Sequence, residues 1–201
     1  MASIVVPFHG AGGKRRLEPE RIRAPIALAM LADVLAACAA VAETVLVTAD
    51  EEGAALASDL AVRTVPDPGR GQGAAVAAGL AAVGGGSALV VNADLPCAQP
   101  RDLLTLLGGL PAGGIALVRG ADGTTNALAL ASPALFAPLY GPGSERRFRE
   151  HAARLGVEAA VAEIPNLAED VDTLDDLERL EERTGPCTRE AFAALRVGLA
   201  R

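Results

Sequence analysis

Ala88-Leu89-Val90-Val91-Asn92-Ala93-Asp94-Leu95-Pro96 carries the clearest structural signal in this 201-residue chain. Its four consecutive apolar residues lie between the glycines at 84–86 and Pro96, a pattern typical of a strand that is buried on both faces of a parallel sheet. Asp94 follows this strand directly, at the carboxyl edge where open α/β sheets bind their ligands. A carboxylate is costly so close to a core. Asp94 is therefore the first candidate functional residue.

Short apolar segments alternate with helical segments along the rest of the chain, and this alternation predicts an α/β fold. We expect a single domain over 1–201, with a mostly parallel sheet flanked by helices, a core over 1–183 and a surface helix over 185–201. Further strands are expected at 4–6, 44–48, 62–65, 115–118, 126–130 and 157–164. Helices are expected at 25–38, 51–58, 74–83, 100–107, 145–155 and 174–183.

Composition and charge narrow the range of partners. The net charge of −7, from 25 acidic and 18 basic residues, argues against a nucleic-acid partner, because a polyanion is bound by basic surfaces. No apolar run approaches the roughly 20 residues of a membrane span, so we expect no membrane partner. Three cysteines without CxxC spacing, and the absence of a signal peptide, predict reduced thiols and a cytoplasmic location. The oligomeric state stays open, a homodimer included.

Two glycine-containing loops follow predicted strands and precede helices. In the first, at 7–17, glycines allow backbone amides to approach an anion, and Lys14, Arg15 and Arg16 would neutralise it. The loop lacks the Gly-Lys-Ser/Thr of a Walker motif, and a solvated loop with surface arginines is the alternative interpretation. In the second, at 69–73, Gln72 lies where a helix N-terminus favours anions and polar ligand edges, although a plain turn has the same pattern.

A second acidic cluster, Asp170-Val171-Asp172, precedes a predicted helix. Alternate residues of an extended segment point the same way, so Asp170 and Asp172 would face one site while Val171 packs inward. Magnesium prefers hard oxygen ligands and keeps several waters, so these two carboxylates and Asp94 are the candidate metal ligands. Ordinary helix capping is the alternative, because Asp-x-Asp-Thr before a helix is also a capping pattern.

Two tight turns, at 123–126 and 141–144, offer hydroxyls and backbone amides that bind a small phosphate or carboxylate without adding net charge. Ordinary loop architecture is the alternative for each. The chain has no Gly-x-Ser-x-Gly nucleophile elbow, and His9 and His151 do not suggest a catalytic triad. Hydrolysis by covalent catalysis is therefore not expected.

Taken in order, these segments resemble the guanylyltransferases of coenzyme F420 biosynthesis. This family includes 2-phospho-L-lactate guanylyltransferase and its bacterial phosphoenolpyruvate-using relatives, and the resemblance extends nearly to Arg183. The motifs that carry it are Val5-Val6-Pro7, Lys14-x-Arg16-Leu17, Leu28-Ala29-Met30-Leu31-x-Asp33-Val34-Leu35, Val65-Pro66-Asp67-Pro68, Ala93-Asp94-Leu95-Pro96, Thr125-Asn126-Ala127-Leu128, Tyr140-Gly141-Pro142-Gly143-Ser144 and Asp170-Val171-Asp172-Thr173.

The resemblance implies a GT-A-like nucleotidyltransferase fold and a Mg²⁺-dependent reaction. In that reaction the phosphate of a phosphorylated three-carbon acid attacks the α-phosphate of GTP, and pyrophosphate leaves. The implied catalytic residues are Lys14 and Asp94, and the implied metal ligands are Asp94, Asp170 and Asp172. The implied nucleotide-binding residues are Pro7, Lys14, Arg16, Asp67 and Gln72. The implied acid-binding residues are Thr125, Asn126, Gly141, Gly143 and Ser144.

Three positions depart from the family pattern. His9 stands where a lysine-like cation is expected, Arg15 replaces a small hydroxyl residue, and Gly73 replaces an asparagine for which Gln72 would compensate. Two alternatives stay open, of which the departures at His9 and Gly73 support the second. One is a molybdopterin or sugar-phosphate nucleotidyltransferase, and the other is a catalytically silent nucleotide-binding protein. The Ala-, Gly- and Arg-rich composition indicates a GC-rich bacterial genome and favours phosphoenolpyruvate over 2-phospho-L-lactate.

Overall fold

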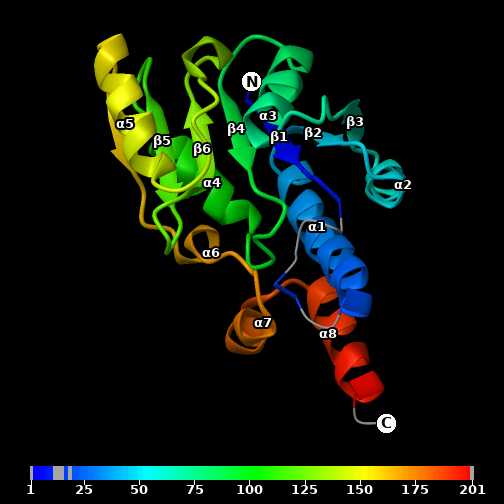
Figure 1. Ribbon diagram of the computed structural model, residues 1–201. Helices are drawn as coiled ribbons and strands as arrows, with labels where there is room; N and C mark the ends of the chain where they lie inside the picture. Colours follow the sequence, from blue (N-terminus) through cyan, green and yellow to red (C-terminus); the bar gives the residue numbers. More distant parts are fainter. Residues whose placement is uncertain (1, 11–15, 18–19, 200–201) are drawn as a thin grey trace.

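A seven-stranded sheet forms the centre of the protein, and the computed structural model describes it together with its helices over residues 2–10, 16–17 and 20–199 (Figure 1). The strand order is β3-β2-β1-β4-β6-β5-β7. The strands are β1 (Ser3–Pro7), β2 (Glu43–Thr48), β3 (Arg63–Pro66), β4 (Ala88–Val91), β5 (Ile115–Arg119), β6 (Thr125–Leu130) and β7 (Ala159–Val161).

Strand direction decides which residues share an edge of the sheet. β1 pairs in parallel with β2 and β4, β2 with β3, and β5 with β7. β6 runs antiparallel to both of its neighbours, β4 and β5. The prediction of a mostly parallel sheet is confirmed. Because β6 is reversed, its first residues, Thr125 and Asn126, lie at the same edge as the carboxyl end of β4.

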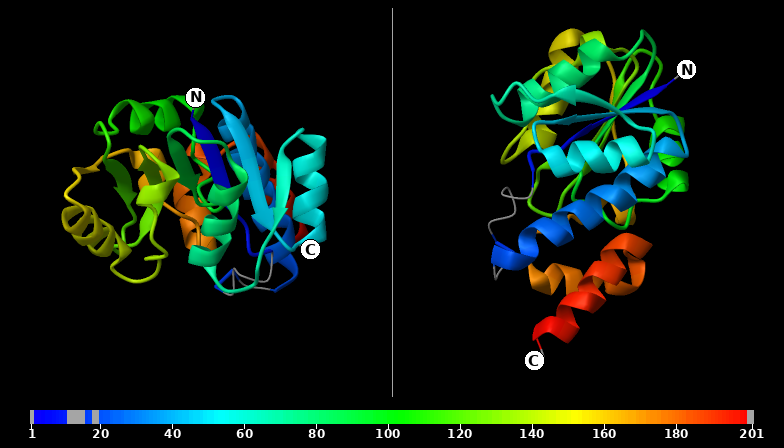
Figure 2. Two further views of the ribbon diagram at one scale, coloured as in Figure 1. Left: turned by 90° about the horizontal axis from the view of Figure 1, so that it is seen from above. Right: turned by 90° about the vertical axis from the view of Figure 1, so that its right-hand side faces the viewer.

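Helices cover both faces of the sheet, as Figure 2 shows from two sides. Along β1, Ile4 and Val6 pack into one apolar layer while Val5 packs into the opposite one, as the two-residue period of a strand requires. The first layer is covered by α1 (Arg23–Ala39), α2 (Glu51–Asp59), α4 (Pro100–Gly108) and α6 (Pro165–Ala168), and the second by α3 (Gln72–Ala82) and α5 (Ser144–Leu155). None of the helices in the described part of the chain has both the length and the apolar character that crossing a membrane requires.

The strand expected over 157–164 is wrong in length. β7 pairs with β5 only at Ala159–Val161, and the amide of Ala162 adds one more hydrogen bond to Leu117 before the chain leaves the sheet. Pro165 occupies the first position of α6. Since proline fixes the backbone near helical angles and lacks an amide donor, the apolar run that predicts a long strand is divided between a short strand and a helix.

The predicted C-terminal helix is present at the surface, and one of its faces packs against the rest of the protein. α8 (Pro186–Leu199) lies against α1, and with α7 (Leu174–Leu180) it encloses a third apolar cluster that includes Met30, Val171 and Phe192. Asp33 of α1, only 6% exposed, joins the two helices. Its carboxylate accepts hydrogen bonds from the amides of Cys187 (3.0 Å) and Thr188 (2.8 Å) in the first turn of α8.

Replacing Asp33 with Ala is expected to lower the free energy of unfolding by about 1–3 kcal/mol, because two buried helix-terminal amides lose their acceptor. Asp33→Asn, which keeps one acceptor oxygen, should lose less. Urea unfolding followed by circular dichroism measures both. The control is Asp59→Ala at the exposed end of α2, which should change stability by less than about 0.5 kcal/mol. Equal losses at Asp33 and Asp59 would contradict this role.

Candidate functional site

Three carboxylates converge just beyond the end of β4. One oxygen from each of Asp94, Asp170 and Asp172 lies within 4.8 Å of the others. The backbone explains the convergence, since the amide of Val171 donates to the carbonyl of Asp94 at 3.1 Å while its side chain is fully buried in the third apolar cluster. With Val171 held in this way, its two neighbours face the end of β4. Carboxylate oxygens in such a group suit a hard divalent cation.

Helix capping, the alternative for the acidic pair, is carried out by other residues. Thr173 begins α7 with a reciprocal capping box: its hydroxyl accepts from the amide of Asp176, and the carboxylate of Asp176 accepts from the amide of Thr173. Asp176 also accepts from the amide of Asp172. Burial raises the pKa of Asp176, but hydrogen bonds from Thr173, Arg179 and the two amides outweigh burial and lower it. The cap therefore contributes stability at neutral pH that is lost as the pH falls through this depressed pKa.

A network of charged and amide side chains holds the residues that precede Asp170. Glu169, next to Asp170, accepts hydrogen bonds from both Arg179 and Arg183. Arg183 also donates to Asn166, which donates to Asp102 of α4 at 2.9 Å. These contacts connect the segment before Asp170 to three helical elements, so the position of the carboxylates depends on more than the local chain.

Arg16 and Asn126 are among the described residues whose side chains contact the carboxylate cluster. The Nη1 atom of Arg16 lies 3.4 Å from the carboxylate of Asp172, and the amide of Asn126 donates to Asp170 at 3.4 Å. Arg16 is thus placed at the acidic end of the site, whereas Asn126 connects that end to β6. Lys14 and Arg15, the other cations predicted for this loop, lie outside the described residues.

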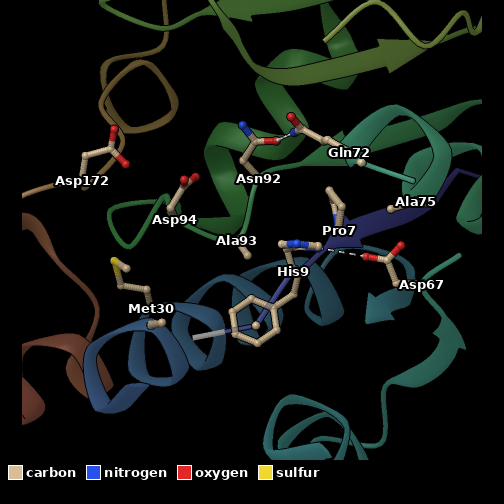
Figure 3. Close-up of a pocket in the computed structure, with 14 residues that line it drawn as sticks. Pro7, His9, Met30, Asp67, Gln72, Ala75, Asn92, Ala93, Asp94 and Asp172 are labelled. Carbon is tan, nitrogen blue, oxygen red and sulfur yellow. Dashed lines mark hydrogen bonds and ion pairs between the residues drawn. The ribbon is translucent and has the colours of Figure 1, made fainter. Parts of the chain in front are cut away.

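A cavity of about 430 Å³ opens beside the carboxylates, within the usual size range of small-molecule sites (Figure 3). Asp94 and Asp172 line one end of it. The predicted nucleotide-binding residues Pro7, Asp67 and Gln72 line the remainder, with apolar contributions from residues such as Met30. The cavity is therefore strongly acidic at one end and mixed apolar and polar at the other.

Hydrogen bonds hold the polar residues of the cavity wall in place. Gln72 donates to the side-chain oxygen of Asn92 at 2.8 Å, and the Nδ1 atom of His9 lies 3.4 Å from the carboxylate of Asp67, as the dashed lines in Figure 3 show. The sequence analysis did not identify Asn92. Its place directly after β4, two residues before Asp94, was the available signal.

The two tight turns predicted separately form one cluster. The hydroxyl of Ser144 donates to that of Thr125 at 3.1 Å, and both residues are almost completely buried, at 0% and 1% exposed. The amide of Glu145 donates to the carbonyl of Gly123 at 3.4 Å. The hydroxyl pair thus fastens the N-terminus of α5 to the start of β6. Accessible backbone in this cluster lies at two positive-φ glycines, Gly141 (+107°) and Gly143 (+70°).

Close packing explains why glycine occupies position 73. A Cβ atom there would lie 2.6 Å from the Cβ of Pro138, closer than real carbon atoms approach. A second hollow, of about 770 Å³, lies between 68–78 and 138–141, and it shares Gly71 and Gln72 with the first cavity. The departure from the family asparagine therefore accompanies a close approach between the second glycine loop and the chain leading to Gly141.

Cys97 is not suited to act as a nucleophile. It is 1% exposed, and burial raises the pKa of its thiol, an effect that the nearby arginines Arg183 and Arg179 only partly offset. The thiolate is the reactive form of cysteine, and this environment disfavours it. The described part of the site consequently offers carboxylates, amides and backbone groups, with Cys97 outside its reactive chemistry.

Comparison with known proteins defines the class of the chain. The family model of the MobA-like NTP transferase domain matches residues 11–164, and the chain belongs to this family. It is 38% identical over 213 residues to the phosphoenolpyruvate guanylyltransferase of Geodermatophilus obscurus, covering 99% of this chain and 95% of the relative. It is 39% identical over 187 residues to the phosphoenolpyruvate guanylyltransferase of Nocardia farcinica, covering 87% and 80%. Within the MobA-like family, the chain belongs with the phosphoenolpyruvate guanylyltransferases.

A solved structure supports the same fold. The nucleotide-diphospho-sugar transferase structure from Desulfovibrio desulfuricans G20 superposes with a TM-score of 0.77 and covers 99% of this chain and 95% of that chain. At 16% identity this likeness concerns the fold alone. It confirms the expected GT-A-like α/β architecture, in which a mostly parallel sheet carries the site at its carboxyl edge.

Proposed function

We propose that this chain is a Mg²⁺-dependent guanylyltransferase of coenzyme F420 biosynthesis that joins GTP to phosphoenolpyruvate and releases pyrophosphate. The observation that carries the proposal is the convergence of Asp94, Asp170 and Asp172 at one end of a nucleotide-sized cavity. The relatives named phosphoenolpyruvate guanylyltransferase, which span nearly the whole chain, support the choice of substrates. 2-Phospho-L-lactate is the alternative acid.

The charges at the two ends of the cavity would determine how a bound nucleotide is oriented. Three carboxylates within 4.8 Å would repel a triphosphate unless a cation lies between them, and their oxygens are the ligands that Mg²⁺ prefers. A bound Mg²⁺ would supply positive charge that neutralises the phosphates and the leaving pyrophosphate. Arg16 beside Asp172, together with Lys14 from the preceding segment, would add further positive charge at this end. The nucleoside would then extend toward Pro7, Asp67 and Gln72.

The acid would occupy the neighbouring turn cluster. Asn126 connects the two regions, because it follows Thr125 in β6 and its side chain donates to Asp170. An acid held near Gly141 and Gly143 would present its phosphate toward the carboxylate cluster, where the α-phosphate of GTP would also lie. Catalysis would then rest on placing two phosphates in line and on neutralising their charge.

A direct assay tests the proposal. The purified chain is incubated with GTP, Mg²⁺ and either phosphoenolpyruvate or 2-phospho-L-lactate, while pyrophosphate release is followed and the GMP-linked product is identified by mass spectrometry. We expect release with phosphoenolpyruvate. No release with either acid would contradict the proposal. Release only with a molybdopterin or a sugar phosphate would favour the alternative nucleotidyltransferase. Binding of GTP without turnover would favour a silent nucleotide-binding protein.

Two further expectations concern the setting of the reaction. The thiols of Cys38, Cys97 and Cys187 are all free, which supports a reducing compartment such as the cytoplasm. A homodimer stays a prediction that sedimentation of the purified chain would test.

Gln72 is expected to contribute to nucleotide selection. Replacing it with Leu keeps much of its volume but removes the amide that donates to Asn92 at the cavity wall. We expect the KM for GTP to rise about five- to tenfold, the loss of one hydrogen bond. The KM for the acid, measured in the same assay, is the internal control and should stay within about twofold. A rise in the KM for the acid alone would contradict a role of Gln72 in GTP binding.

A further inference from the structure

One guanidinium group organises the irregular segment that precedes α5. Arg147 donates through Nε and Nη2 to the carbonyl of Leu139, at 3.1 and 2.9 Å, and through Nη2 to the carbonyl of Tyr140 at 3.0 Å. Its Nη1 atom donates to the carbonyl of Pro142. Three carbonyls of one short segment therefore turn toward a single side chain.

The direction of those carbonyls sets the direction of the amides that follow them. In a planar trans peptide the C=O and the N–H point to opposite sides. Because the carbonyls of Tyr140 and Pro142 face Arg147, the amides of Gly141 and Gly143 face away from it. Pro142 between them has no N–H, so these two amides are the donors that this turn can offer to an anion.

The side chains of Leu139 and Tyr140 anchor this segment to the second apolar layer, but its glycines leave the backbone after them free to turn. Gly141 and Gly143 have φ values of +107° and +70°, where glycine has freedom that other residues lack, and the segment belongs to no strand. Within the turn, the amide of Ser144 donates to the carbonyl of Gly141, and the amide of Arg147 donates to that of Gly143. The side chain of Arg147 adds to these contacts by holding the carbonyls of Leu139, Tyr140 and Pro142.

The chemistry of arginine suits this task. Its guanidinium is planar, always charged and carries five N–H donors in a fixed fork, whereas lysine has one ammonium on a flexible stem. In Arg147 the donors are committed to backbone carbonyls, so the side chain is held as part of the wall. The amides that it turns outward carry no net charge of their own.

We infer that Arg147 is a positioning residue for the phosphorylated acid, which it serves by aiming the amides of Gly141 and Gly143 at the anionic group of that substrate. The inference rests on the proposed function for the identity of the substrate. It goes beyond that proposal by assigning a role to a residue that contacts neither the carboxylate cluster nor the 430 Å³ cavity lining among the contacts described.

The test compares the same substitution at two neighbouring arginines of α5. Arg147→Lys keeps the charge but cannot reach three carbonyls, and we expect its KM for phosphoenolpyruvate to rise about tenfold, with the KM for GTP within about twofold. Arg147→Met should raise the acid KM further. Arg146→Lys is the control, because the side chain of Arg146 is 78% exposed and pairs with Glu150 at 3.6 Å on the surface of the same helix. Circular dichroism verifies that each variant is folded.

A spectroscopic measurement separates this inference from the proposed reaction. In the ¹⁵N-labelled wild-type chain, phosphoenolpyruvate should shift the amide resonances of Gly141 and Gly143, and Arg147→Lys should reduce those shifts. Unchanged shifts and KM in Arg147→Lys, or equal rises in both KM values, would overturn the role of Arg147. Wild-type protein that shows the shifts but releases no pyrophosphate would overturn the proposed reaction and leave the role of Arg147 supported. Wild-type protein that shows neither the resonance shifts nor pyrophosphate release would overturn the role of Arg147 and the proposed reaction together.

Discussion

Asp94→Asn is expected to lower the rate of pyrophosphate release at least about a hundredfold, the scale seen when one charged group that stabilises a transition state is removed. Asparagine has nearly the same shape and retains one oxygen, but it lacks the negative charge that would hold a divalent cation. The fold should survive, because the contact that joins this position to Val171 uses the backbone carbonyl of Asp94 and not its side chain.

The control for this variant is Asp175→Asn. Asp175 is exposed in the first turn of α7, three residues beyond Asp172, so its substitution removes the same charge from the same region without touching the cluster. Turnover should stay within about twofold of the wild type. Titration with Mn²⁺, followed by electron paramagnetic resonance, reads metal binding independently of activity. Turnover of Asp94→Asn equal to that of the wild type would remove this carboxylate from the mechanism.

Gly79→Ala is expected to lower the free energy of unfolding by about 1–3 kcal/mol, and Gly79→Val by more, because both overpack a filled core. Gly79 lies in α3 where the helix approaches the sheet most closely. An added Cβ would meet Val5 at 2.4 Å and Val47 at 2.8 Å, and both are β-branched residues with restricted side chains. Intrinsic helix propensity favours alanine by about 1 kcal/mol, so a net loss would show that packing outweighs propensity.

Gly108→Ala is the matched control for Gly79→Ala. Gly108 is exposed at the end of α4, and no atom lies within 4 Å of the Cβ position. The same substitution there should leave stability unchanged or raise it by up to about 1 kcal/mol. Urea unfolding of both variants gives the comparison. A Gly79→Ala variant as stable as Gly108→Ala would show that the α3–sheet interface accommodates a methyl group.

Local pattern predicted much of the fold and the centre of the site. The apolar run at 88–91 forms β4 and predicts that Asp94 lies at the edge of the sheet. The alternation around Val171 predicts that Asp170 and Asp172 face one way. Their convergence with Asp94 depends on the hydrogen bond between the amide of Val171 and the carbonyl of Asp94, which joins residues far apart in sequence. Such predictions succeed because a two-residue or 3.6-residue period is a property of neighbouring residues along one chain.

Other parts of the prediction failed or stayed incomplete where the cause is distant in sequence. The expected strand over 157–164 is shortened by the helix that Pro165 begins, and the expected surface helix is α8, whose first turn is capped by Asp33 of α1. The hydroxyls of Thr125 and Ser144 are buried against each other, and their contact with substrate stays a prediction. Nothing in the local sequence around either residue indicates its partner.

Local sequence patterns predict the order of strands and helices, the carboxylates at the sheet edge and the glycine loops. They can do so because hydrophobic spacing and turn chemistry act between near neighbours. Only the packed structure determines that Gly73 meets Pro138, that Gln72 reaches Asn92, and that Arg147 turns the amides near Gly141. These contacts join residues on separate elements of the fold. They form only when the helices and the sheet are packed together, because in a close-packed interior small differences in side-chain volume decide which atoms touch.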